Sequence, residues 1–159
     1  MPQLRAALTD AGFEDVRTYV QSGNGVLTSS DSAAEAARAC ERVIEKEFGL
    51  KIPVVVRTRA ALARVVSRNP LAKVANDPKR YQVSFLEKKP SAELIGKLAA
   101  EAAPGERVVA DGREIYAWHP EGVARSKLWA ALAGKGLGVT ATARNWTTVT
   151  KLLELADAG

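Results

Sequence analysis

The stretch that decides the fold is RVVADGREIYAW, which occupies residues 107–118. Two short runs rich in β-branched and aromatic residues flank Asp111-Gly112 in this stretch. An Asp-Gly pair between such runs is among the strongest short-range signals for two antiparallel strands joined by a tight turn. We therefore predict a β-hairpin here and interpret the rest of the chain outward from it.

The segments around the hairpin predict a mixed α and β half. A strand is expected over residues 81–85, where Tyr81, Val83 and Phe85 alternate with polar or small residues. Ser91 is placed to cap a helix that Pro104-Gly105 ends. After the hairpin we expect one helix broken by glycines 134, 136 and 138, and a last helix from about residue 142 to residue 156.

The first half of the chain has a similar order of elements. We expect a helix over residues 2–12, and strands over residues 16–21 and 26–28 with a turn between them. The capping box SAAE at residues 32–35 opens a second helix, whose predicted apolar face ends at Phe48. A strand over residues 52–57 and a short helix capped by Thr58 follow.

The fold class that this order predicts is α+β, with two ferredoxin-like halves built on the split βαβ plan. The halves cover residues 1–70 and 78–159, and the polar residues 71–79 form the linker. The first half lacks its opening strand, which in this plan lies inside the sheet, so two strands are left with unpaired edges. Residues upstream of Met1, a strand from a partner chain, or a sheet that closes differently would each resolve this.

Composition restricts the class of protein. The chain has 159 residues, 47% hydrophobic and 26% charged, which is typical of a globular domain and unlike a disordered one. Its apolar runs are far shorter than the ~20 residues that cross a bilayer, and no secretory leader opens it, so we expect a cytoplasmic protein. With one cysteine, Cys40, and one histidine, His119, we expect no disulfide, no metal and no cofactor.

The charge of the chain is unevenly distributed. The formal net charge is +5, and no Asp or Glu occurs between Gly122 and Leu153. This segregation predicts a positive surface that attracts phosphates or acidic partners, although solvated side chains on two helices would also account for it. The basic residues of the segment are Arg125, Lys127, Lys135, Arg144 and Lys151.

Several blocks of sequence carry a family resemblance that extends over essentially the whole chain. They are LRAAL (4–8), GFEDVRTYVQSGN (12–24), PVVVRT (53–58), GVARSKL (122–128) and TARNWTTVTKL (142–152). In this order they resemble the uncharacterised bacterial family called domain of unknown function 1697. The resemblance implies a pair of ferredoxin-like repeats and no established activity. It also implies a preceding strand and a Leu-Arg-Gly-Ile-Asn-Val-Gly-Gly stretch, which this chain lacks ahead of Met1.

The candidate anion site comprises Arg125, Ser126 and Lys127 at a helix start, joined by Arg144 and Lys151. Bare N–H groups of a helix N-terminus, with hydroxyl and cationic side chains, suit phosphate or carboxylate. Trp146 beside Arg144 would suit stacked bases of single-stranded nucleic acid. The alternatives are that Ser126 only caps the helix, and that Trp146 is a core residue with Trp129 the exposed ring.

A second candidate is a polar pocket. It would use Gln21 and Asn24 of the glycine-containing turn, and Tyr116 and His119 at the end of the hairpin. Both pairs are equally compatible with an ordinary turn and an ordinary surface loop. Ser126 and Lys127 are sequence neighbours that point apart on a helix, and we find no recognised catalytic motif.

Three functional hypotheses follow. The leading one is a non-catalytic binding module for an anionic partner, either nucleic acid or a phosphorylated small molecule. The competing one is an enzyme with a small-molecule site between the halves, near Tyr116, His119 and Ser126. The third is self-association, as a homodimer, through the unpaired sheet edge.

Overall fold

The computed structural model describes residues 2–19, 23–133 and 137–158 of an α+β protein with two antiparallel sheets. The chain divides into two compact units. The first unit comprises residues 1–63 and 150–159, and the second comprises residues 64–149.

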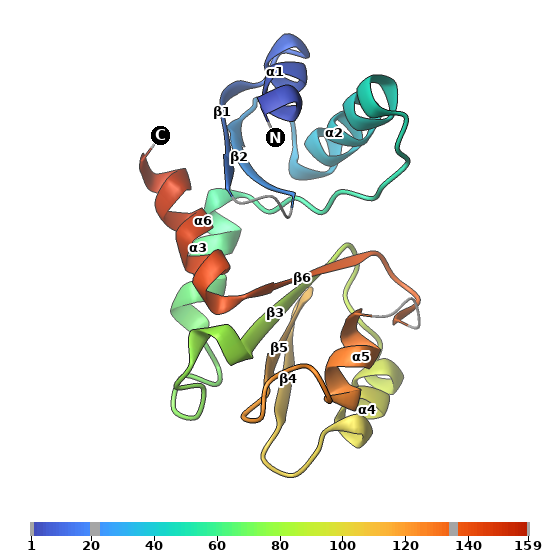
Figure 1. Ribbon diagram of the computed structural model, residues 1–159, viewed down its shortest axis with the longest axis vertical. Coiled ribbons are helices and arrows are strands. Elements are labelled where there is room, and N and C mark those ends of the chain that lie inside the picture. The colour runs from blue at the N-terminus through green and yellow to red at the C-terminus, as the bar shows by residue number, and fades with distance from the viewer. Residues whose placement is uncertain (1, 20–22, 134–136, 159) are drawn as a thin grey trace. The chain divides into compact units, whose positions relative to one another are not determined.

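The second unit contains a four-stranded sheet with two helices on one face (Figure 1). Its strand order is β4-β5-β3-β6, and each neighbouring pair is antiparallel. The element order β-α-β-β-α-β is that of the split βαβ plan. The elements are β3 (Tyr81–Leu86), α4 (Ala92–Glu101), β4 (Arg107–Asp111), β5 (Glu114–Trp118), α5 (Lys127–Ala133) and β6 (Ala141–Asn145).

The predicted hairpin is present as β4 and β5. Its register pairs Asp111 with Glu114 and Arg107 with Trp118, so the turn consists of two residues. Gly112 has φ 60°, a left-handed conformation that glycine adopts without strain. The predicted hairpin therefore forms, but its two turn residues are Gly112 and Arg113, one position later than the Asp111-Gly112 turn that the sequence predicts.

One face of this sheet packs against α4 and α5. The apolar side chains that alternate toward the helices form a buried cluster with Leu98 of α4 and with Leu128 and Leu132 of α5. Ser91 caps α4, because its hydroxyl accepts a hydrogen bond from the Leu94 N–H. The sheet residues of the cluster are Leu86, Ile115 and Ala117.

The opposite face of the same sheet is aromatic. Tyr81 stacks on Trp146 with 4.8 Å between ring centroids, and lies 6.4 Å from Tyr116. The Tyr81 hydroxyl donates to Asn69 Oδ1 at 2.8 Å, and the Tyr116 hydroxyl donates to the Val65 carbonyl at 3.4 Å. Residues 64–69 therefore belong with the sheet of the second unit.

The boundary between the two units does not lie at residues 70–78, where the sequence analysis predicted it. Leu71 is buried, and a short 3-10 turn, η1 (Pro78–Arg80), leads directly into β3. The two units divide inside α3 (Arg59–Arg68) and inside α6 (Trp146–Ala158). A polar composition suggested a linker between the halves, but the segment lies within the second unit, with Leu71 buried.

The beginning of the predicted last helix is a strand. Residues 141–145 form β6 and pair with β3, with Ala143 opposite Ser84, and the helix begins only at Trp146. Asn145 separates the two elements, because its Oδ1 accepts a hydrogen bond from the Thr148 N–H at 2.9 Å. The expectation of a helix from residue 142 was wrong here.

The first unit has a two-stranded sheet and a small core. The strands are β1 (Glu14–Tyr19) and β2 (Asn24–Thr28), and they follow α1 (Pro2–Asp10). The predicted capping box is present at α2 (Ala33–Phe48): Ser32 Oγ accepts from the Glu35 N–H and donates to Glu35 Oε1. The core contains Leu8, Phe13, Ala36 and Cys40.

The predicted strand over residues 52–57 is absent from the structure. Val54 packs against the core of the first unit, but its N–H donates to the Glu41 carboxylate at 2.8 Å rather than to a neighbouring strand. In the split βαβ plan the last strand pairs with the first, and the described residues before β1 provide no strand. Residues 52–56 are apolar and mostly β-branched, but they pair with no strand among the described residues.

Two further features concern the surface. Phe48, expected on the buried face of α2, is 40% exposed, because the buried stripe of the helix ends at Ile44. Thr58 caps α3 as predicted, through a hydrogen bond from the Ala61 N–H. Across the described ranges, none of the helices combines the length and the apolar character that spanning a membrane requires.

Candidate functional site

Three polar side chains meet at the point where the hairpin ends and α5 begins. Glu106 immediately precedes β4, His119 immediately follows β5, and Ser126 immediately precedes α5. Because Arg107 pairs with Trp118, the next pair in the same register is Glu106 and His119. The hairpin thus places the carboxylate opposite the imidazole.

The three groups share one carboxylate oxygen. Glu106 Oε2 lies 2.6 Å from His119 Nδ1 and accepts a hydrogen bond from Ser126 Oγ, also at 2.6 Å. An ionised carboxylate only accepts hydrogen bonds, so we assign a proton to His119 Nδ1, which donates a hydrogen bond to Glu106 Oε2. Ser126 Oγ and His119 Nδ1 lie 3.2 Å apart, and both donate to Glu106. His119 Nδ1 therefore cannot take the proton of Ser126. Glu106 Oε1 accepts from the Ala103 N–H at 2.9 Å.

The environment keeps Glu106 ionised. Burial raises the pKa of this carboxyl, but the hydrogen bonds from Ser126, the Ala103 N–H and His119, together with the attraction of the imidazole, outweigh burial. The net result is a pKa below the ordinary value of 4.5. The cluster is therefore a hydrogen-bonded network around a buried anion, in which the second ring nitrogen of His119, Nε2, is buried without a hydrogen-bond partner in the described part of the chain.

The hydroxyl of Ser126 is fully used within the fold. It accepts a hydrogen bond from the Trp129 N–H at 2.9 Å, which is the geometry of a helix cap, while its proton goes to Glu106. A nucleophilic serine needs a base that can take its proton as it attacks a substrate, commonly the Nε2 atom of a histidine. In this cluster Ser126 lies beside Nδ1 of His119, so the three residues do not have the geometry of a hydrolytic triad. Their hydrogen bonds stabilise the start of α5.

His119 does not lie in a surface loop, which was the alternative to the predicted pocket. Its side chain is 0% exposed, its N–H donates to the Arg80 carbonyl, and its ring meets that of Trp129 edge to face, with 6.0 Å between centroids. Tyr116 projects from the opposite, aromatic face of the sheet, because it is three positions from His119 along an extended segment, and an odd spacing reverses the face. The two do not line one pocket. Asn24 is buried in the first unit, and Gln21 lies outside the described residues.

Two of the predicted cations form an exposed basic pair at the start of α5, which we call the α5 flank. Arg125 and Lys127 are both exposed, and neither forms an ion pair with another residue of the described ranges. Ser126 lies between them in sequence and faces the interior. The α5 flank is thus the part of the predicted anion site that remains available to a partner.

The other two predicted cations lie elsewhere. Arg144 is half-buried on β6, and its guanidinium donates to Thr142 Oγ1 at 2.6 Å and to the Ala143 carbonyl at 2.8 Å. Its partner in the ladder is Val83, which alternates onto the aromatic face, away from α5. Burial lowers the pKa of Arg144. Lys151 is partly buried on α6 and belongs to the first unit.

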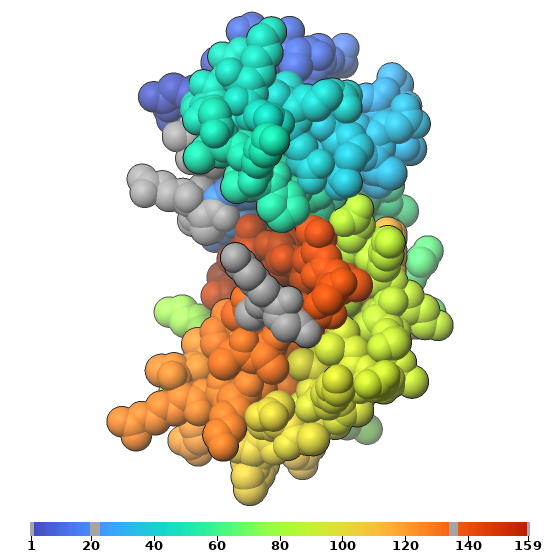
Figure 2. Space-filling view, turned by 90° about the vertical axis from the view of Figure 1, so that its right-hand side faces the viewer, coloured from blue at the N-terminus to red at the C-terminus, as the bar shows by residue number. Residues whose placement is uncertain are grey.

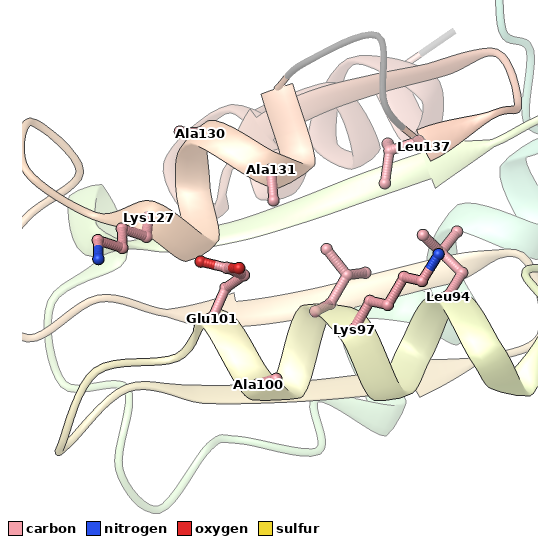
Figure 3. A pocket seen from close by; sticks show the side chains of 9 residues that line it. Leu94, Lys97, Ala100, Glu101, Lys127, Ala130, Ala131 and Leu137 are labelled. Carbon is pink, nitrogen blue, oxygen red and sulfur yellow. The ribbon is translucent and has the colours of Figure 1, made fainter.

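Beside the α5 flank, α4 and α5 border an open groove of about 500 Å³ (Figure 3). In the space-filling view the surface of α4 (yellow) lies beside that of α5 (orange) (Figure 2). Apolar side chains form most of the groove, and three charged ones reach it. The lining residues are Leu94, Lys97, Leu98, Ala100, Glu101, Lys127, Ala130, Ala131 and Leu137.

Sequence reasoning did not identify Glu106 or the groove residues of α4. The predicted turn would not have identified Glu106, since a two-residue turn at Asp111-Gly112 pairs residue 106 with residue 117. The observed turn residues are Gly112 and Arg113, and this register brings residue 106 opposite residue 119. The groove depends on how two helices pack, which no local pattern specifies. Among the residues that the structure describes, no cluster of three His, Cys, Asp or Glu side chains could hold a metal ion.

Comparison with known proteins agrees with this architecture. A family model described as "Protein of unknown function (DUF1697)" matches residues 1–116, and the chain belongs to this family. No curated protein matches it. A solved structure that it resembles is that of the conserved bacterial protein SP0830 from Streptococcus pneumoniae. The two are 21% identical with a TM-score of 0.77, and the alignment covers 98% of this chain and 88% of that one. The similarity shows a shared fold.

Proposed function

We propose that this member of the DUF1697 family is a non-catalytic binding module for an anionic partner, which it contacts through the α5 flank. The observation that carries the proposal is that Arg125 and Lys127 are exposed and form no ion pair with a described residue. The segment 122–153 around them contains no acidic residue. Such a local excess of positive charge attracts phosphates and carboxylates.

The chemistry of the neighbouring cluster supports a binding role rather than catalysis. Ser126, the one hydroxyl beside the α5 flank, is held by Glu106 and by the Trp129 N–H. The buried network fixes the first turn of α5 and hence the backbone from which Arg125 and Lys127 project. A backbone fixed in this way has less conformational entropy to lose on binding.

The test is retention on immobilised heparin, a polyanion. Arg125→Glu combined with Lys127→Glu is expected to elute at a clearly lower salt concentration than the wild type. The matched control is Lys88→Glu with Lys89→Glu, which reverses two other exposed lysines of the second unit. Each reversal lowers the charge by two, so both double variants fall from +5 to +1.

Because the charge change is the same, only a local site separates the two variants. Equal loss of retention would mean that net charge alone is responsible, and unchanged retention of the Arg125 and Lys127 variant would refute the proposal. Thermal unfolding of both variants is expected to match the wild type, since all four side chains are exposed.

We also propose, as a second candidate, that the first unit mediates self-association. Its described sheet has two strands, and a sheet of this size is marginal in water without further pairing. Three apolar side chains at the end of α2 and after it are 40–52% exposed: Phe48, Leu50 and Ile52. Light scattering over a range of concentrations tests this, and a constant monomer mass would exclude it.

A further inference from the structure

The groove between α4 and α5 has the size and chemistry of a recognition site. Its volume of about 500 Å³ lies in the range of ligand pockets, and its walls come from two helices of one unit. Leu94 and Leu137 lie toward one end, and Glu101 and Lys127 lie toward the other (Figure 3). Ala100, Ala130 and Ala131 are the small side chains among the lining residues.

The charges around the groove are arranged asymmetrically. Lys127 both lines the groove and belongs to the α5 flank, with Arg125 two residues away. On α4, Lys97 lines the groove, and its 3.5 Å ion pair with Glu93 is largely exposed to solvent, so it competes weakly with a partner. Glu101 is the acidic member of the lining residues. Acidic groups of a partner are therefore favoured along α5 rather than beside Glu101.

The tryptophans Trp129 and Trp146 of the second unit are already used inside the fold. Trp129 meets the buried ring of His119, and Trp146 stacks on Tyr81, while the lining residues of the groove include no aromatic ring. Proteins that bind single-stranded nucleic acid combine cations with rings on which bases stack. Apolar walls contribute little to a nucleic acid, but they bury the aliphatic side chains of a protein.

Building on the proposed function, we propose that the anionic partner is an acidic, amphipathic helix of another protein, with its apolar face in the α4–α5 groove. The backbones of α4 and α5 satisfy their own hydrogen bonds and offer no sheet edge to an extended peptide. A helix satisfies its own backbone groups and presents apolar side chains three and four residues apart. Its acidic flank lies against Arg125 and Lys127.

The test uses a fluorescently labelled synthetic helical peptide with leucines three and four residues apart on one face and glutamates beside them. Fluorescence anisotropy measures its binding to the full chain. Ala130→Gln places a longer, neutral side chain in the groove and is expected to weaken binding about tenfold. Its matched control, Ala133→Gln, alters an exposed alanine of the same helix that does not line the groove, and is expected to leave binding unchanged.

Charge variants test the orientation. Lys127→Gln is expected to weaken the peptide, whereas Glu101→Gln is expected to tighten it by removing a repulsion. Peptides with leucine replaced by serine, or glutamate by glutamine, are expected to lose affinity. A labelled single-stranded oligonucleotide that binds while the peptide does not would overturn the inference in favour of nucleic acid.

The outcomes separate the two proposals. If the wild type does not bind the peptide, or if Ala130→Gln and Ala133→Gln bind it equally, the inference fails. Heparin retention that still depends on Arg125 and Lys127 would leave the proposed function intact in that case. Heparin retention that does not depend on these two residues refutes the proposed function, whatever the peptide does.

Discussion

At the start of α5, one hydroxyl group joins a helix to a buried carboxylate. Ser126 Oγ accepts from the Trp129 N–H at 2.9 Å and donates to Glu106 Oε2 at 2.6 Å. Ser91 caps α4 in the same way, but its hydroxyl is exposed and reaches no buried acid. The two serines therefore allow the contribution of the cap to be separated from that of the buried hydrogen bond.

We predict that Ser91→Ala lowers the free energy of unfolding by about 1 kcal/mol, the usual effect of losing a cap. Ser126→Ala is expected to lower it by about 2–3 kcal/mol, because a buried carboxylate also loses a donor. Chemical denaturation of both variants measures the difference. Equal effects of the two substitutions would show that the Ser126–Glu106 hydrogen bond adds nothing to stability.

The carboxyl of Glu106 predicts a pH dependence with a definite sign. Its pKa in the folded protein is below the ordinary value of 4.5, so the folded state prefers the ionised form. The resulting stability is present at neutral pH and is lost as the pH falls from about 4.5 through the folded pKa. Glu106→Gln removes this contribution at every pH.

The variant and the wild type are thus expected to differ most in unfolding free energy at neutral pH, and to converge in acid well below 4.5. Denaturation curves at several pH values measure the difference. Glu114→Gln is a suitable control, since Glu114 lies at the other end of the same hairpin. A difference that grows on acidification would contradict the assignment of a lowered pKa to Glu106.

Among the elements, those with strong local signals could be predicted from sequence. The Ser32 and Thr58 caps are each specified by a hydroxyl that accepts a hydrogen bond from a nearby backbone N–H, so their prediction needed no tertiary information. The hairpin was predicted from Asp111-Gly112, but its turn lies one residue later. β6 lacks such a signal. Its alanines and threonines have no clear preference, and pairing with β3 decides its conformation.

The boundary between β6 and α6 depends on Asn145. We predict that Asn145→Ala destabilises the protein by about 1 kcal/mol, because the Thr148 N–H loses its acceptor. Asn145→Asp is expected to retain the stability, since a carboxylate caps equally well and is favoured by the helix dipole. Thermal unfolding of both variants measures this. Equal losses for both substitutions would show that Asn145 acts through packing instead of capping.

For the molecule as a whole, the sequence indicated the excess of positive charge but not its placement. Arg125 and Lys127 are two positions apart in sequence, in an exposed turn and in the first turn of a helix, so their proximity needed no tertiary information. The position of Arg144 depends on the register of β6 against β3, which turns its guanidinium onto the aromatic face. Arg144 is therefore not part of the α5 flank, whose two members are close in sequence.

Because the α5 flank is a local site, we also predict how the affinity for a polyanion depends on salt concentration. Binding to a polyanion releases counterions, so the logarithm of the affinity falls linearly with that of the salt concentration, and the slope reflects the number of ionic contacts. If Arg125 and Lys127 both contact heparin, their replacement by glutamine should lower the slope by about two. Lys88→Gln with Lys89→Gln, which removes the same charge, should leave the slope unchanged. Affinity measured at several salt concentrations decides the question. Identical slopes for the two double variants would place the contacts elsewhere on the surface, because a diffuse field weakens alike whichever lysine or arginine is lost.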